Sequence, residues 1–240
     1  MKMNNSDEFI VYAHRGASEY CPENTLLSFY TGIFMGANGI ETDVQITKDG
    51  VLVLFHDDTL TRMTGAEGSI RDYTYDELLS LSVKKNELTD KIPTFEDFLS
   101  HFAHRDITFA IELKVGGVEQ AVADMIFKYG IEKKTVVTSF EFDYIRAMKK
   151  YAPSLKIGYL TTNVDDAMID ELLSMGADEI CPKGVSLTAE QVNKWHARGL
   201  NVRAWGIADV DIMRSVYAAG ADGMTVNFPD RLVEHIAKNK

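Results

Sequence analysis

Acidic residues occur two positions apart within segments that are otherwise apolar and β-branched. Glu41 and Asp43 lie late in one such segment, and Glu112 is followed two positions on by Lys114 at the end of another. Residues two apart in a strand point to the same face, so each pair is expected to share one side of a sheet. Three carboxylates that converge repel one another and are costly to desolvate unless a cation neutralises them. We therefore expect Glu41, Asp43 and Glu112 to hold a divalent ion that prefers oxygen ligands, Mg²⁺ or Ca²⁺.

Two of the six histidines are placed for acid and base chemistry. His14 ends the first predicted strand, and His56 follows the apolar run Val51–Phe55. A lone histidine is usually structural, but a pair beside a metal ion can divide the work: one takes a proton from an attacking hydroxyl, and the other protonates a leaving oxygen. The sequence does not fix which of the two acts first. The other four fall in predicted helices and receive no role: His101, His104, His196 and His235.

Arg15 and Lys114 are candidate phosphate-binding residues. Arg15 offers planar, bidentate donors, and Lys114 adds a point charge. Together with a metal ion they imply an anionic substrate, which an acidic protein recruits through local rather than net charge. Ordinary ion pairs are the alternative for each. Arg15 could pair with Glu23 or Glu41, and any one carboxylate of the cluster with Lys114 or Arg203.

Two further polar or aromatic residues lie beside predicted strand ends. Trp205 ends a predicted strand, where it either packs between elements or forms a hydrophobic wall for a substrate. Asn24, within Pro22-Glu23-Asn24-Thr25, is predicted to cap the N-terminus of the following helix.

The elements that must position these residues alternate between short β-branched runs and longer stretches with helical periodicity, which predicts parallel strands joined by crossover helices. Eight strands are expected, the number that closes a (β/α)8 barrel: 9–13, 39–45, 107–113, 135–139, 155–160, 178–181, 201–205 and 223–226. Three glycines between a predicted helix and a strand are typical of left-handed helix caps: Gly36, Gly176 and Gly220. In such a barrel the active site lies at the C-terminal ends of the strands, where the polar residues above fall.

About sixty residues separate the second predicted strand from the third, which is too long for one crossover. We expect an insertion at about 46–105, opening with the turn Thr47-Lys48-Asp49-Gly50 and containing helices at 75–81 and 94–102. No Pro- or Ser-rich linker separates it from the rest, so residues 1–240 are expected to form one domain.

Composition excludes several classes of function. The chain of 240 residues has 25 Lys and Arg against 36 Asp and Glu, a net charge of -11, which disfavours binding to nucleic acid or anionic lipid. Cys21 and Cys181 form neither a disulfide framework nor a zinc motif. No signal peptide is visible, and the apolar runs are far shorter than the roughly 18 residues of a membrane-spanning helix. We expect a soluble, cytoplasmic protein with a small-molecule substrate.

Taken together, the motifs resemble those of the glycerophosphodiester phosphodiesterase family, and they occur in the family's order over nearly the whole chain. They are His14-Arg15-Gly16-Ala17, Pro22-Glu23-Asn24-Thr25, Glu41-Thr42-Asp43-Val44, His56-Asp57, Glu112-Leu113-Lys114 and Thr225-Val226-Asn227-Phe228-Pro229. The resemblance implies hydrolysis of glycerophosphodiesters, such as glycerophosphocholine or glycerophosphoethanolamine, to glycerol 3-phosphate and an alcohol.

The resemblance also implies roles for individual residues. Positions matching Glu41, Asp43 and Glu112 hold the metal ion, and those matching Arg15 and Lys114 contact the phosphate. The two histidines act as general acid and base. A mechanism similar to the family's has the glycerol 2-hydroxyl attack phosphorus and expel the alcohol, which leaves a cyclic phosphate that water opens.

One departure from the family's pattern follows Trp205, where Gly206-Ile207-Ala208 stands in place of Thr and a Val-Asn pair. This puts the preference for the alcohol in doubt. Three other functions stay open: a lysophospholipase D acting on lipid diesters, a silent phosphate-ester binding protein, and a lyase using a Schiff base on Lys114.

Overall fold

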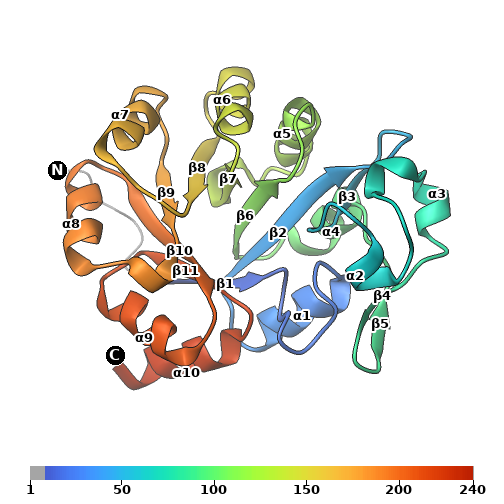
Figure 1. Cartoon of the computed structure of the whole chain (residues 1–240), viewed down its shortest axis with the longest axis horizontal. Helices are drawn as coiled ribbons and strands as arrows, with labels where there is room; N and C mark the ends of the chain where they lie inside the picture. Colours follow the sequence, from blue (N-terminus) through green and yellow to red (C-terminus); the bar gives the residue numbers. More distant parts are fainter. Residues whose placement is uncertain (1–8, 240) are drawn as a thin grey trace.

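The computed structural model describes residues 9–239, and its central feature is a closed barrel of eight parallel strands (Figure 1). The strands are β1 (Ile10–His14), β2 (Gly39–Ile46), β6 (Thr108–Leu113), β7 (Thr135–Ser139), β8 (Lys156–Thr161), β9 (Glu179–Pro182), β10 (Asn201–Ile207) and β11 (Gly223–Val226). Each pairs with the next around the barrel, and β1 closes it by pairing with both β11 and β2. The predicted (β/α)8 fold is confirmed, and each predicted strand coincides with an observed one to within two residues.

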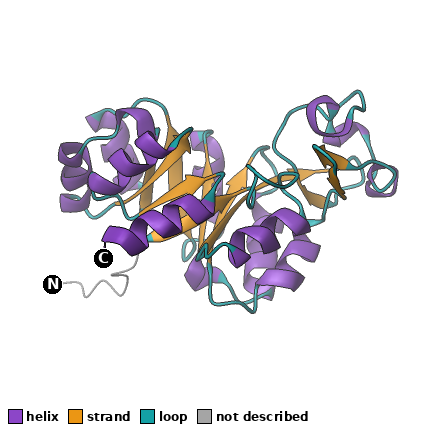
Figure 2. Ribbon diagram, turned by 90° about the horizontal axis from the view of Figure 1, so that it is seen from below, coloured by secondary structure: helices purple, strands orange, loops and turns teal. Residues whose placement is uncertain are grey.

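Helices surround the strands on the outside of the barrel (Figure 2). They are α1 (Leu26–Phe34), α4 (Phe95–Phe102), α5 (Glu119–Lys128), α6 (Phe142–Tyr151), α7 (Asp166–Ser174), α8 (Ala189–Ala197), α9 (Val210–Ala218) and α10 (Pro229–Asn239). The main core lies between this ring and the outward faces of the strands, and it includes Ile40, Val44, Ile111 and Leu113. These are the neighbours of the candidate carboxylates, so the alternation along β2 and β6 sends the acidic side chains inward.

The three glycines predicted as helix caps have positive φ angles: 93° at Gly36, 75° at Gly176 and 83° at Gly220. They follow α1, α7 and α9, and each leads into the next barrel strand. The left-handed backbone costs little at glycine, which explains the recurrence of this residue at the three turns.

The predicted insertion contains both a separate hydrophobic cluster and one helix of the barrel. After β2 the chain turns at Asp49-Gly50 into β3 (Leu52–Leu54), which pairs antiparallel with β2. Short elements follow: α2 (Thr61–Thr64), α3 (Tyr75–Leu78), β4 (Val83–Lys85) and β5 (Leu88–Asp90). Buried residues in and between these elements, among them Leu60 and Ile70, join Phe55 in a cluster distinct from the main core. By contrast, α4 packs in the main core, so the part with its own cluster ends before Thr94.

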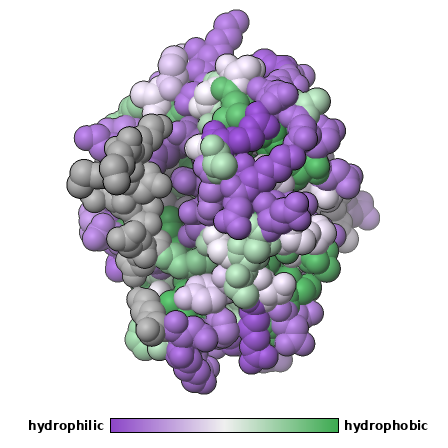
Figure 3. Space-filling model, turned by 90° about the vertical axis from the view of Figure 1, so that its left-hand side faces the viewer, coloured by the Kyte–Doolittle hydropathy of each residue, from purple (hydrophilic) through white to green (hydrophobic). Residues whose placement is uncertain are grey.

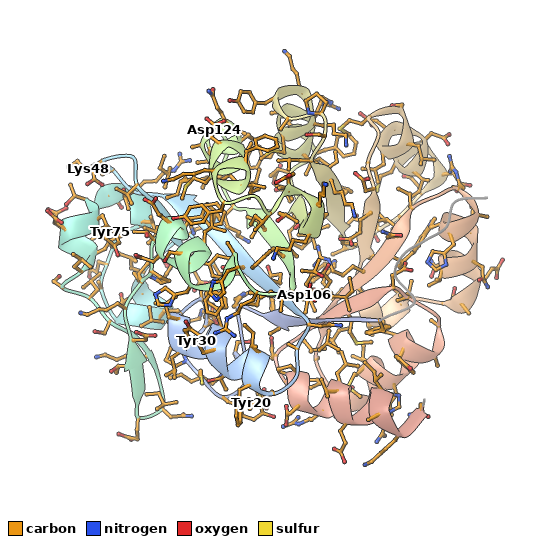
Figure 4. The ribbon with its side chains drawn as sticks, turned by 180° about the vertical axis from the view of Figure 1, so that it is seen from behind. Tyr20, Tyr30, Lys48, Tyr75, Asp106 and Asp124 are labelled. Carbon is orange, nitrogen blue, oxygen red and sulfur yellow. The ribbon has the colours of Figure 1, made fainter. Side chains whose placement is uncertain are left out.

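Local contacts hold this part of the chain together. The backbone N–H of Lys48 donates to the carbonyl of Tyr73 at 2.9 Å, and that of Tyr75 donates to Asp49 Oδ1 at 3.0 Å. Lys48 and Tyr75 accordingly lie at the same end of the molecule (Figure 4). These contacts close the segment back onto the turn between β2 and β3.

The barrel interior holds a buried ion pair on neighbouring strands. Val202 and Ala204 lie in the outer core, so Arg203 between them points inward, where it is 1% exposed. Its Nε lies 2.8 Å from Glu179 Oε1 and its Nη1 donates to Thr225 Oγ1 at 2.9 Å. A guanidinium at this depth is tolerated only because it is paired and hydrogen-bonded.

Glu179→Ala is expected to lower the free energy of unfolding by about 3–5 kcal/mol, because it leaves Arg203 buried without its counter-ion. Glu234→Ala, which removes an exposed pair with Lys238 on α10, is the matched control and should cost less than about 0.5 kcal/mol. Urea unfolding of both variants measures the difference. Equal losses would mean that the interior pair does not stabilise the barrel.

Charged side chains lie on the outer faces of α7 and α8. The face that includes α7 and α8 is mainly hydrophilic, with apolar residues scattered over it (Figure 3). Lys194 on α8 pairs there with Asp166 on α7 at 2.6 Å. Among the described residues, 9–239, no helix combines the length and hydropathy that crossing a bilayer requires.

Candidate active site

Three buried carboxylates meet at the C-terminal ends of β2 and β6. Strand register places Asp43 directly beside Glu112, with Glu41 two residues earlier on the same face. The three side chains offer oxygens that all lie within 4.8 Å of one another. Their residues are only 3%, 0% and 7% exposed for Glu41, Asp43 and Glu112. The predicted acidic cluster is therefore present as a convergent, buried group.

The electrostatics of this cluster show an excess of negative charge. Burial raises the pKa of Glu41 well above its usual value, and the charges of Asp43 and Glu112 add to the effect. Burial, with Asp43, also raises the pKa of Glu112 to about 7. Burial works in the same direction at Asp43, but the nearby positive charges, Arg15 first and Lys114 among the others, together with the hydrogen bond from Asn24, outweigh it and lower the pKa of that carboxyl.

One oxygen of the cluster has no partner among the described residues: Asp43 Oδ1 is buried and accepts no hydrogen bond from residues 9–239. Unsatisfied buried oxygens of this kind call for an explanation such as an ion. Three convergent carboxylates with an open lone pair fit a hard divalent cation, for which oxygen is the preferred ligand.

His14 lies beside the cluster because β1 pairs with β2 in a register that sets it opposite Glu41. Its Nδ1 lies 2.5 Å from Asn227 Oδ1, which also accepts a hydrogen bond from Ser18. An amide oxygen only accepts, so Nδ1 carries the proton and Nε2, 3.9 Å from Glu41 Oε2, keeps its lone pair. Burial, reinforced by the charge of Arg15, lowers the pKa of His14 to about 4. The ring is thus neutral near pH 7.

Arg15 is aimed at the cluster by a tight turn after β1. Arg15 has a φ of 54° and Gly16 a φ of 80°, and a Cβ at Gly16 would lie 2.4 Å from the backbone carbon of Ser28. Only glycine fits there. The turn directs the guanidinium to Asp43 Oδ2, 3.2 Å from Nε, and to Glu23 Oε1, 2.9 Å from Nη1. The ion pair with Glu23 that the sequence offered as an alternative is therefore present.

His56 reaches the site from the segment after β3. Its Nδ1 lies 2.8 Å from Asp57 Oδ1, and its side chain is partly exposed. Hydrogen bonds from Arg62 lower the pKa of Asp57 to about 2, so Asp57 is a carboxylate that accepts from the imidazole N–H. This contact fixes the orientation of the ring and leaves Nε2 free.

The remaining predicted residues lie at the barrel mouth. Lys114 Nζ donates to Glu112 Oε1 at 2.8 Å and lies 3.9 Å from Asp43 Oδ1. Trp205 donates from Nε1 to the carbonyl of Thr161 at 3.2 Å and packs edge-on against Phe140. Trp205 is half-buried, so one part of the indole packs and another part stays accessible.

Two expectations for individual residues were wrong. Asn24 does not cap α1: Thr25 does, by accepting from the backbone of Ser28. Asn24 instead takes a left-handed conformation, φ 56°, and donates to Asp43 Oδ2 at 2.8 Å. His104 lies in the turn after α4, because that helix ends at Phe102.

Several residues that orient the site were not assigned from the sequence, because their partners are distant in the chain. Asn227 contacts His14 across 213 positions, and Arg62 contacts Glu23 across 39. Asn24 had a signal in its position within Pro22-Glu23-Asn24-Thr25, where an asparagine serves a cap and a side-chain network equally well.

A closed parallel barrel with polar side chains gathered at the C-terminal ends of its strands defines the class of (β/α)8-barrel enzymes. The chain belongs to the glycerophosphoryl diester phosphodiesterase family, whose model matches residues 14–231. It is an enzyme with glycerophosphodiester phosphodiesterase activity.

Relatives and solved structures agree with this assignment. A glycerophosphodiester phosphodiesterase of Caldanaerobacter subterraneus subsp. tengcongensis is 33% identical over 95% of this chain and 98% of its own. One of Bacillus altitudinis is 33% identical over 93% and 96%. An Oleispira antarctica phosphodiesterase, solved with the product sn-glycerol-3-phosphate, superimposes with a TM-score of 0.87 and 26% identity, covering 95% of this chain and 96% of that one.

Proposed function

We propose that this enzyme hydrolyses soluble glycerophosphodiesters, such as glycerophosphocholine and glycerophosphoethanolamine, to sn-glycerol 3-phosphate and the alcohol. The observation that carries the proposal is the convergence of three buried carboxylates with two histidines whose Nδ1 atoms are both engaged. Such an arrangement allows the histidines to transfer protons to and from the oxygens of a phosphate whose negative charge is neutralised by cations at the site. We place the reaction in the cytoplasm.

Glu41, Asp43 and Glu112 are the residues that would hold a divalent ion, Mg²⁺ or Ca²⁺, through their carboxylate oxygens. When bound, the ion supplies positive charge that polarises a phosphoryl oxygen and stabilises the charge that develops in the transition state. Asn24 supports this set by holding Asp43 Oδ2 in place.

His14 and His56 divide the proton transfers in this proposal. His14 is neutral with a free Nε2 lone pair, so it accepts the proton of the glycerol 2-hydroxyl as the oxygen attacks phosphorus. His56 then donates a proton to the departing alcohol oxygen, and the P–O bond to the alcohol breaks. In the second step the histidines exchange roles: His56 takes a proton from a water molecule as its oxygen attacks phosphorus, and His14 returns its proton to the glycerol 2-oxygen as the P–O bond to that oxygen breaks. The second step thus restores both histidines to the protonation states that they had before the first step.

Arg15 and Lys114 complete the binding of the phosphate. Both cations already contact the carboxylate cluster, at 3.2 Å and 2.8 Å, so a phosphate entering beside the ion meets them without large rearrangement. Trp205 lies at the mouth, where its accessible side is available to the carbon atoms of the substrate.

The test is release of glycerol 3-phosphate from glycerophosphocholine and glycerophosphoethanolamine, with Mg²⁺, with Ca²⁺ and with a chelator. We expect release that depends on the metal ion. Release of choline and lysophosphatidic acid from lysophosphatidylcholine, with no turnover of the deacylated diesters, would replace the proposal with a lysophospholipase D activity. Binding of the diesters without turnover in any metal would indicate a silent binding protein.

A further inference from the structure

Arg62 makes the most extensive set of ion pairs near the site, although it lies outside the barrel, in α2. Its Nε and Nη2 donate to Asp57 Oδ2 and Oδ1 at 2.5 and 2.8 Å. Its Nη1 and Nη2 donate to Glu23 Oε2 and Oε1 at 2.9 and 2.6 Å. One guanidinium thus forms two bidentate contacts with two carboxylates, the geometry in which arginine binds most strongly and most specifically.

The two carboxylates connect Arg62 to different parts of the molecule. Asp57 accepts from His56 Nδ1 at 2.8 Å, and Glu23 belongs to the segment between β1 and α1, where it also pairs with Arg15. Arg62 therefore ties the residue that orients His56 to a segment that is fixed to the barrel.

No barrel strand carries His56. It follows β3 in the segment that has its own small hydrophobic cluster. By contrast, His14 is held by the strand pairing of β1 with β2. The chain beside His56 is nevertheless hydrogen-bonded to β2: the backbone N–H of Phe55 donates to the carbonyl of Asp43 at 3.1 Å, and Gln45 Nε2 donates to the carbonyls of Phe55 and Asp57 at 3.0 and 2.9 Å. What the Asp57 and Arg62 side chains add is the orientation of the His56 ring.

One oxygen of Glu23, one oxygen of Asp57 and one ring nitrogen of His56 lie within 4.8 Å of one another. Two ionised carboxylates at that separation repel, so a cation placed between them stabilises this arrangement. The Arg62 guanidinium contacts all four oxygens of these two carboxylates, whereas Arg15 contacts only Glu23 of the two.

We infer that Arg62 is a positioning residue that holds His56 in place for catalysis by joining Asp57 to Glu23. The inference rests on the proposed function, in which His56 protonates the leaving alcohol. Arg62 does not contact the reacting atoms. Its effect is carried by the Asp57–His56 hydrogen bond.

The experiment compares two glycerol phosphodiesters that differ in the leaving group. Glycerophosphoethanolamine leaves an alkoxide that needs a proton, whereas glycerophospho-p-nitrophenol leaves a stable phenolate that needs none. We expect Arg62→Met to lower kcat for the first about 10–100-fold, with KM changed less than about threefold, and kcat for the second less than about threefold. Arg62→Lys keeps the positive charge but loses the two bidentate contacts. Its kcat for glycerophosphoethanolamine should lie between those of Arg62→Met and the unmodified enzyme.

Two controls make the outcome specific. Arg71→Met removes an exposed arginine of the same part of the chain, and it should leave both substrates unaffected. Asp57→Asn should match Arg62→Met on both substrates, and the double variant should lose no more than either single one, because the two residues act in series.

The failures are distinguishable. No turnover of either diester by the unmodified enzyme would overturn the proposed function, and this role with it. An active enzyme in which His56→Ala is impaired but Arg62→Met is not would overturn the role of Arg62 alone. Equal losses on both diesters would also overturn it, because they would show a general structural effect instead of one on protonation of the leaving group.

Discussion

His14→Ala is expected to lower kcat by roughly 10²- to 10⁴-fold while leaving the fold and the metal content intact. The reason is that His14 is the neutral imidazole at the carboxylate cluster, with Nδ1 held by Asn227 and Nε2 free to accept a proton. His56→Ala is expected to cause a loss of the same order on substrates with alkoxide leaving groups. Steady-state release of glycerol 3-phosphate, with circular dichroism to verify folding, measures both.

The pH profile gives this prediction a further test. Because burial and Arg15 lower the pKa of His14 to about 4, the ring stays unprotonated, and able to act as a base, down to about pH 4. At saturating metal ion, the acidic limb that His14 sets in kcat/KM should lie near pH 4 and not near 6.5. His235→Ala, on the outer helix α10, is the control and should be fully active. Full activity in either the His14 or the His56 variant would contradict the acid and base assignment.

Removal of divalent metal ions is expected to lower the rate at least about 10²-fold, since the charge they supply to a phosphoryl transition state is worth several kcal/mol. Mg²⁺ or Ca²⁺ should restore it. Glu112→Gln keeps the shape of the side chain but removes one ligand charge, so the half-saturating concentration of metal ion should rise at least about 10–100-fold. Turnover in the presence of a chelator, with no metal in the purified protein, would refute this prediction.

Protons compete with the metal ion at the same carboxylates. Burial and the charge of Asp43 raise the pKa of Glu112 to about 7 in the protein without an ion, so binding below that pH must displace a proton. The half-saturating metal concentration should therefore rise as the pH falls below 7, with the proton on Glu112 contributing up to about tenfold for each pH unit. Calorimetric titrations at pH 6 and pH 8 measure this, and Glu112→Gln should flatten the dependence.

The barrel and its acidic cluster were predictable because they depend on short-range patterns. Alternation along β2 directs Ile40 and Val44 to the outer core and Glu41 and Asp43 into the barrel. The same two-residue period therefore predicts which side chains pack in the core and which carboxylates converge. Glycine at a helix end has a similarly local cause, and Gly36 is one of three caps that the structure confirms.

Other features depend on partners that sequence spacing does not show. The β4–β5 hairpin has three-residue strands that are largely exposed, so no alternation of apolar and polar residues predicts it. Its turn contains Asn86 at a φ of 51°. The contacts of Asn24, Asn227 and Arg62 are side-chain hydrogen bonds across the fold. From sequence alone, the presence of such a residue is explained equally well by a local role, such as a helix cap.

The contact between His14 and Asn227 joins the first barrel strand to the residue just after the last one, where β1 pairs with β11 to close the barrel. The proposed base is therefore oriented only when the two ends of the chain have met. During synthesis the N-terminal strand leaves the ribosome long before its partner, so the enzyme gains activity late, at the step with the largest loop to close. Enzymatic activity therefore requires a closed barrel. The rate at which turnover appears during refolding would measure the rate of that closure.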